Sequence, residues 1–408
     1  MYVPPSRLSR ARSIGPRPDG AFTATAASSI CCHDLEERTL KHVDVPGGDT
    51  WQAFLAYGAL FQPWLESRAS VRTEPLCSAD VAPLRVLTQR YGTSTSLAWI
   101  LERSRPSEEV RAYSNLALLY GRTKAERQMQ GLERLVHAMN RAGVTPLLLK
   151  GSAARVGGIY PDPGFRLMAD IDLIVPPEHL ASCVAAAEAA GFAIVAKPPG
   201  AEAGHALQQY SDEFALLLEV HHQLTRIYER ENFPAEMLFE AAHLAEFRGG
   251  HVLLPDWSHH AALTILHAVA WDRSRHMALV PIKALLDLAA LKASDAPVSW
   301  SAVAQLLERA GERSSLIHVE TLFRALFGTA LTEIDISPAR QKRILRFYAL
   351  GAAYPILHHV GLAVTEVRRR LIRARRQPAR LLQLLNPGFY WRMARTTRKA
   401  LDSKTALH

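Results

Sequence analysis

Two short apolar runs, residues 144–149 and 169–175, frame the most constraining stretch of this sequence, "VTPLLLKGSAARVGGIYPDPGFRLMADIDLIV". The first run stops at Lys-Gly-Ser, and the second carries Asp170 and Asp172 one residue apart. Side chains alternate between the two faces of a strand, so both aspartates point the same way while their apolar neighbours point into the core. Two carboxylates a few ångströms apart repel by about 4 kcal/mol at an effective dielectric of 20. The pair therefore suggests a bound cation.

A third carboxylate interrupts another apolar run, "FALLLEVHHQ", at Glu219. Three leucines precede it, which is not typical of a solvated surface. His221 shares the face of Glu219, and His222 lies on the opposite face. If the two acidic strands are neighbours in one sheet, three carboxylates surround one pocket. Oxygen ligands with room for water and phosphate suit Mg²⁺, and two such ions can clamp the attacking and leaving oxygens of a phosphoryl displacement.

The turn between the two framing runs supplies groups that suit phosphate. Gly151 allows a backbone to approach a ligand closely. We expect Ser152 to cap a short helix over 152–158, whose N-terminus favours anions. Lys150 and Arg166 add positive charge nearby. Each signal is weak alone, but their order along the chain predicts a site for a triphosphate with Mg²⁺.

Apolar periodicity divides the chain into helical and mixed parts. A helix over 124–143 is expected to end at a glycine. Beyond the framing runs, strands are expected at 192–197 and as a hairpin of 205–210 with 214–223. The predicted fold class is α+β, a small mixed β-sheet flanked by helical regions. The predicted parts are a disordered N-terminal segment (1–44), a helical N-terminal region (45–143), an α/β core (144–250), a helical C-terminal domain (251–365) and a basic helical tail (366–408).

Composition places the chain among soluble globular proteins, with 408 residues, 48% hydrophobic and 21% charged. The four cysteines are scattered without metal-ligand spacing, which indicates a reducing compartment and no disulfide framework. No apolar run reaches the roughly 18 residues of a membrane span. No apolar segment follows the early arginines, so a secretory signal is not expected. We expect a cytoplasmic protein.

The net charge of +9 is concentrated at the C-terminal end. From Arg368 onward there are twelve Lys and Arg against one acid, Asp402. The tail (366–408) is either a surface for an anionic membrane or an acidic partner, or a solvated helix whose leucines pack on the body. A membrane role would place the protein at the inner membrane face. Nucleic acid is less favoured, since basic and aromatic residues are not interleaved.

Other tempting residues are assigned to structure. Trp257 and Trp271 are expected in the core rather than stacked on a base. Asp287 either reaches the cleft or accepts a bond from Arg273 or Arg275. Without a His-Glu-x-x-His pattern, four histidines are assigned to packing or hydrogen bonding: His259, His260, His267 and His276.

Together, the Gly-Ser turn, the Asp-x-Asp strand and the later acid resemble the polymerase-beta-like nucleotidyltransferase superfamily. More narrowly, the chain resembles the bacterial nucleotidyltransferase family 5 through "LLLKGSA", "YPDPGFRLMADIDLIV", "LLLEVHHQL" and "LLDLAAL". The resemblance covers roughly residues 125–295. It departs from the family at Glu219, where members often have Asp followed by Leu-His-Trp.

For the acids, the resemblance implies that Asp170 and Asp172 bind Mg²⁺, with two ions expected. Glu219 would complete the metal site and help to deprotonate an acceptor hydroxyl. His221 would position Glu219 or the acceptor. Because the two aspartates repel, replacing both with Asn should stabilise the metal-free protein or leave it unchanged.

For the nucleotide, the resemblance implies that Gly151 and Ser152 hold the β- and γ-phosphates, while Lys150 and Arg166 stabilise triphosphate charge. The implied reaction is attack of an acceptor hydroxyl on the α-phosphate of an NTP, with ATP expected, and release of pyrophosphate. The acceptor would be a small molecule, glycan precursor, peptide or protein. Two alternatives stay open: a phosphotransferase acting at the γ-phosphate on a modified peptide, and a nucleotide-binding sensor or antitoxin-like module with little turnover.

Overall fold

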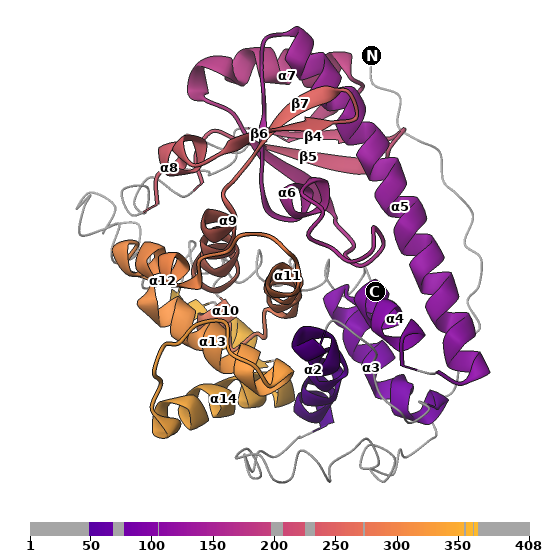
Figure 1. Cartoon of the computed structure of the whole chain (residues 1–408), viewed down its shortest axis with the longest axis vertical. Coiled ribbons are helices and arrows are strands. Elements are labelled where there is room, and N and C mark those ends of the chain that lie inside the picture. The colour runs from indigo at the N-terminus through magenta and orange to yellow at the C-terminus, as the bar shows by residue number, and fades with distance from the viewer. Residues whose placement is uncertain are drawn as a thin grey trace, which may run out of the picture.

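The computed structural model of this chain has an α+β architecture, as predicted (Figure 1). A mixed sheet occupies one end of the molecule. Helices from the N-terminal and C-terminal parts of the chain occupy the other end. The predicted disordered segment (1–44) and the basic tail (366–408) lie outside the described residues. These residues are 49–67, 77–104, 106–196, 207–224, 233–271, 274–354, 356–361 and 363–365.

The helical N-terminal region contains α2 (Asp49–Ser67), α3 (Ser78–Tyr91), α4 (Ser94–Glu102) and α5 (Glu108–Arg141). Helix α5 runs along the side of the molecule from these helices to the sheet (Figure 1). Its N-cap, Ser107, accepts a hydrogen bond from the Val110 amide. Its C-terminal end is confirmed, because Gly143 follows with φ of +74°. The helix begins well before the predicted residue 124, so it spans both the helical region and the sheet.

The sheet within the described residues has seven strands in the order β3-β4-β5-β2-β1-β7-β6. Central strand β2 pairs in parallel with β5 and antiparallel with β1. The predicted strand over 144–149 is wrong in extent, since only two of its residues are paired. The strands are β1 (Leu147–Leu148), β2 (Asp170–Ile174), β3 (Ala193–Ala196), β4 (Leu207–Ser211), β5 (Leu216–His221), β6 (His243–Phe247) and β7 (Gly250–Leu254).

Sequence reasoning missed the hairpin formed by β6 and β7. Arg248 and Gly249 form its turn, and both have positive φ, as a tight two-residue hairpin requires. The alternation of apolar side chains in these strands is masked by charged and histidine residues on exposed positions. Strand β7 pairs in parallel with β1 through Leu147 and Leu253, so the sheet continues past residue 250.

The sheet is covered on both faces, which divides the hydrophobic core in two. On one face, a smaller core includes Leu148 and Ile171 and is covered by α5 and α7. On the other face, a larger core includes Leu147 and Ile174 and extends through the helical regions. Neighbouring strand residues face opposite sides, which explains this division. The helices between strands are α6 (Lys150–Val156), the 3₁₀ turn η1 (Pro177–His179), α7 (Leu180–Ala189) and α8 (Ala235–Glu240).

The C-terminal helices follow the sheet, as the sequence predicted. Helix α2 packs on α13, so the two helical regions form one body. These helices are α9 (Trp257–Ile265), the π-helix η3 (Leu266–Trp271), α10 (Ser274–Met277), α11 (Ile282–Ala293), α12 (Trp300–Arg309), α13 (Arg313–Phe327) and α14 (Pro338–Ala353).

Two histidines in this region, the buried His260 and the half-buried His318, predict a loss of stability in acid. Burial lowers the pKa of His260 and of His318 to about 4. An unfolded histidine titrates near 6.5, so the unfolded state binds more protons between about pH 6.5 and pH 4, and stability falls as pH falls through that window. Over this pH range, each histidine should lower the free energy of unfolding by up to about 3 kcal/mol. In thermal melts across this range, His260→Leu should flatten the pH dependence, whereas replacement of exposed His251 should not. Equal slopes in both variants would contradict the assignment.

No single helix in the described ranges is long and apolar enough to cross a bilayer. Helix α14 and the segment Ile356–Thr365 meet the length and composition test only as a pair, and they are bent by 113°. Three apolar residues of that segment, Ile356, Val360 and Val364, are exposed. The role of the tail that follows, at an anionic membrane or an acidic partner, remains a prediction.

Candidate active site

The predicted acids lie on neighbouring strands. Strands β2 and β5 run in parallel with Asp172 opposite Glu219. The residues that directly precede the two acids, Ile171 and Leu218, are fully buried on the opposite face. The acidic face is therefore the one turned towards the larger core and the helical regions. Register alone brings the two carboxylates together, as the alternation of apolar residues indicated.

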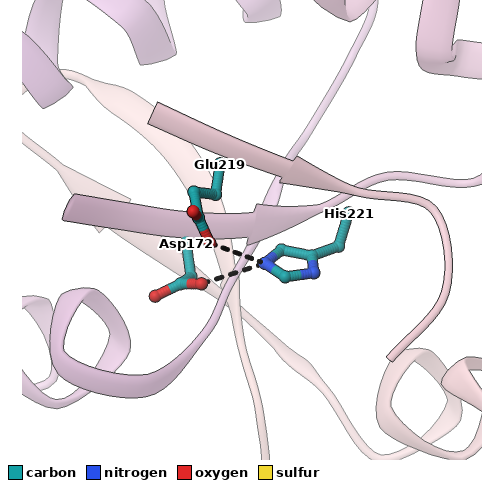
Figure 2. A group of neighbouring side chains, drawn as sticks. All are labelled: Asp172, Glu219 and His221. Atoms are coloured by element: carbon teal, nitrogen blue, oxygen red, sulfur yellow. Dashed lines mark hydrogen bonds and ion pairs between the residues drawn. The ribbon is translucent and has the colours of Figure 1, made fainter. Parts of the chain in front are cut away.

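Asp172, Glu219 and His221 converge at this face, and each offers a ligand atom within 4.8 Å of the others (Figure 2). His221 Nε2 lies 2.9 Å from Asp172 Oδ1 and 4.0 Å from Glu219 Oε2. Gln208, opposite Glu219 on β4, donates to Glu219 Oε1 at 2.6 Å and fixes that side chain. Asp170 is half-buried and is not a member of this group. The group thus differs from the predicted ligand set by containing a histidine.

The two aspartates of β2 have different electrostatic environments. Burial raises the pKa of Asp170, and the charges of Asp172 and Glu219 raise it further. Burial alone would also raise the pKa of Asp172, but bonds from His221 and Lys150 hold it well below its usual range. Asp172 is therefore a stable anion, while Asp170 carries the cost of the crowded negative charge.

Lys150 lies at the start of α6 and places its ammonium on Asp172. The distance from Nζ to Oδ1 is 2.7 Å. Its φ of +49° is uncommon for a residue with a Cβ, and such strain tends to occur at functional sites. Lys150 therefore contacts the acidic group directly, through Asp172. From the sequence, this lysine was expected to lie near the phosphates.

Ser152 does not cap a helix, so that prediction is wrong. Helix α6 begins at Lys150 with Leu149 as its N-cap, and Ser152 lies inside the first turn. Its hydroxyl donates to the carbonyl oxygens of Leu149, at 2.6 Å, and Asp172, at 2.9 Å. The side chain thus fastens α6 to β2 beside the acids. Gly151 packs closely, because a Cβ there would lie 2.9 Å from the Met168 sulfur.

Arg166 forms a largely buried ion pair with Asp287 of α11. Its Nε lies 3.0 Å from Asp287 Oδ1, and Tyr160 donates to the same oxygen at 3.0 Å. Asp287 therefore does not bond Arg275, which pairs with Glu312 instead. The other expected partner of Asp287, at position 273, lies outside the described residues. Sequence reasoning missed this pair because its members are far apart in the chain.

The N-terminal helices hold the same loop from the other side. Ser96 of α4 donates to the Phe165 carbonyl at 2.6 Å. Arg122 of α5 pairs with Asp162 at 2.6 Å. The ring of Phe165 is fully buried among aromatic residues, including Trp99 at 5.2 Å between centroids. The loop that carries Arg166 is therefore fixed by both helical flanks.

The residues assigned to structure behave largely as expected. Trp257 is buried and packs against His260, with ring centroids 5.4 Å apart. His259 Nδ1 lies 3.0 Å from the N-cap carboxylate of Asp256. Trp271 is half-buried against the larger core. None of these histidines joins the cluster of potential metal ligands within the described part of the chain.

The mixed sheet has Asp-x-Asp on one strand and a third acid on its parallel neighbour, which is the arrangement that the sequence resemblance led us to expect. The model of a family described as uncharacterised nucleotidyltransferases matches residues 89–328, more than half of the chain. This chain therefore belongs to that family and is a nucleotidyltransferase. The match also includes all of α4 and α5 and the C-terminal helices through α13, beyond the predicted resemblance.

A solved structure, the antibiotic-resistance factor ANT(2'')-Ia, is similar to part of this chain. The similarity covers 47% of this chain and 95% of that chain, at 18% sequence identity and a TM-score of 0.32. The two chains thus superpose only in part. No curated protein sequence matches this chain.

Proposed function

We propose that this chain transfers the NMP group of a nucleoside triphosphate, with ATP expected, to a hydroxyl of an acceptor molecule. The observation that carries the proposal is the pairing of Asp172 with Glu219, with Lys150 at 2.7 Å from Asp172. Lys150 offsets one of the negative charges of Asp170, Asp172 and Glu219. A bound metal ion would offset the others, because buried charge is costly unless it is paired.

The donor groups fit a divalent metal ion, with Mg²⁺ as the expected one and two ions as the expected number. Carboxylate oxygens of Asp172 and Glu219 are close enough to share an ion, and Asp170 extends the acidic face along β2. A bound metal would neutralise triphosphate charge and polarise the phosphorus under attack.

The residues of this chain then have distinct tasks. Glu219, held by Gln208, accepts the proton of the acceptor hydroxyl. The acceptor oxygen forms a bond to the α-phosphorus, and the bond from that phosphorus to the bridging oxygen of the β-phosphate breaks. Pyrophosphate leaves with the electron pair, and Lys150 and Arg166 stabilise its charge. Positioning and electrostatics provide the acceleration, as in other phosphoryl transfers.

The direct test uses ATP labelled at the α- or the γ-phosphate, incubated with the protein, Mg²⁺ and an extract of its source cells. We expect α-label, and not γ-label, to move to an acceptor, and the transfer to disappear in the variant with both Asp170→Asn and Asp172→Asn. Transfer of γ-label alone would identify a phosphotransferase instead. Bound nucleotide without transfer of either label would favour a sensor.

A further inference from the structure

His221 introduces an imidazole into a site expected to contain only oxygen ligands. It follows Glu219 by two positions on β5, so both side chains lie on the acidic face. The ring is buried, and its Nε2 points towards both carboxylates (Figure 2). The ring nitrogen and two carboxylate oxygens therefore come from two adjacent strands of a rigid sheet.

The separations between these atoms match those of ligands on one ion. With ligand distances of about 2.1 Å, atoms bound at adjacent positions lie about 3 Å apart, and atoms at opposite positions about 4.2 Å apart. His221 Nε2 lies 2.9 Å from Asp172 Oδ1 and 4.0 Å from Glu219 Oε2. Both values fall near this range without any change of backbone.

Neutralising Asp172 does not require the imidazole. Lys150 already places an ammonium 2.7 Å from the same carboxylate oxygen. The bonds from Lys150 and His221 both go to Oδ1. An ion bound between Asp172 and Glu219 would meet the His221 nitrogen on its third side.

We propose that His221 is a nitrogen ligand of the metal site, and that the site therefore prefers a first-row divalent transition ion to Mg²⁺. Imidazole suits transition ions, whereas Mg²⁺ favours oxygen ligands in octahedral geometry. The inference rests on the proposed function only in requiring a metal at these acids. It changes the expected ion and gives His221 a role at the metal.

The test uses Mn²⁺ alone as the probe, with the full chain and no nucleotide. Pulsed electron paramagnetic resonance detects a directly bound nitrogen through its coupling to the Mn²⁺ electron spins. We expect this coupling in the wild type, its loss in His221→Gln and its retention in His222→Gln. The glutamine amide can still donate to Asp172, so a role limited to positioning would survive that change. Thermal melts establish that each variant is folded.

Equilibrium titrations add a second measurement. We expect His221→Gln to weaken Mn²⁺ binding by at least about tenfold and to leave Mg²⁺ binding nearly unchanged, a scale set by the effect of losing groups that support metal ligands. Mn²⁺ that binds through Asp172 without nitrogen coupling would overturn the proposal. Equal losses for both ions would also overturn it. Either result leaves the labelled-ATP test of nucleotidyl transfer unaffected, so the two proposals fail separately.

Discussion

The two aspartates of β2 should respond oppositely to the same substitution. Without metal, Asp172→Asn should lower the free energy of unfolding by about 1–3 kcal/mol, because Lys150 and His221 lose a charged partner. Asp170→Asn should leave the metal-free protein unchanged or more stable, because it removes the carboxylate whose pKa burial and the charges of Asp172 and Glu219 raise. Thermal and urea unfolding of the two single variants measure this difference.

With metal and nucleotide, both variants should lose ligand-induced stabilisation. For the wild type, this gain is about 2.7 kcal/mol at a ligand concentration of 100 times Kd. Nucleotidyl transfer should fall by about 10²–10³-fold or more in Asp172→Asn, since electrostatic stabilisation is the main source of rate. If metal and nucleotide stabilised Asp172→Asn as much as they stabilise the wild type, the metal site would not lie at these acids.

The second large effect concerns the ion pair between Arg166 and Asp287. Replacing Asp287 with Leu should cost about 3–5 kcal/mol, because it leaves a buried guanidinium without its counter-charge. Replacing Arg166 with Leu in the same protein should restore much of the lost stability, since removal of both charges is often close to neutral. Urea unfolding of the single and double variants tests this.

An exposed ion pair serves as the matched control. Arg313 and Glu308 lie 3.2 Å apart, and both are largely exposed. Glu308→Gln should change stability by less than about 1 kcal/mol. If Asp287→Leu lost no more stability than Glu308→Gln, the pairing of Asp287 with Arg166 would not contribute to stability. If the double variant regained stability and also transferred nucleotide normally, Arg166 would have no role at the triphosphate.

How far the sequence predicts the site depends on whether contacts are local. Strand alternation is a local rule, and it correctly placed Glu219 and His221 on one face of their strand; the pairing of β2 with β5 brings Asp172 to the same face. The same reasoning treated Asp170 and Asp172 as an isolated repelling pair, because it could not show that Lys150 occupies the space beside one of them. Ser152 was predicted to cap a helix because serine is a common N-cap residue. Its hydroxyl instead donates to a carbonyl oxygen of the neighbouring strand β2.

The fold shows the same limit. The C-terminal half of α5 and strand β2 were predictable from periodicity, whereas β6 and β7 form a hairpin through a tight turn at Arg248 and Gly249. Their place in the sheet depends on pairing with β1, which lies far away in sequence. The partner of Arg166 could not be predicted, because nothing near it in the chain indicates Asp287.

The loop fixed by both helical flanks also sets the order in which the enzyme can become active during its synthesis. Arg166 and Asp287 are 121 positions apart, so the ribosome makes the lysine, the acids and then the last strand, β7, before the residue that anchors this arginine. Domains generally fold from the N-terminus as they emerge. The growing chain can thus complete its sheet once β7 has been made, but it completes the proposed triphosphate site only after α11 has been made and has docked.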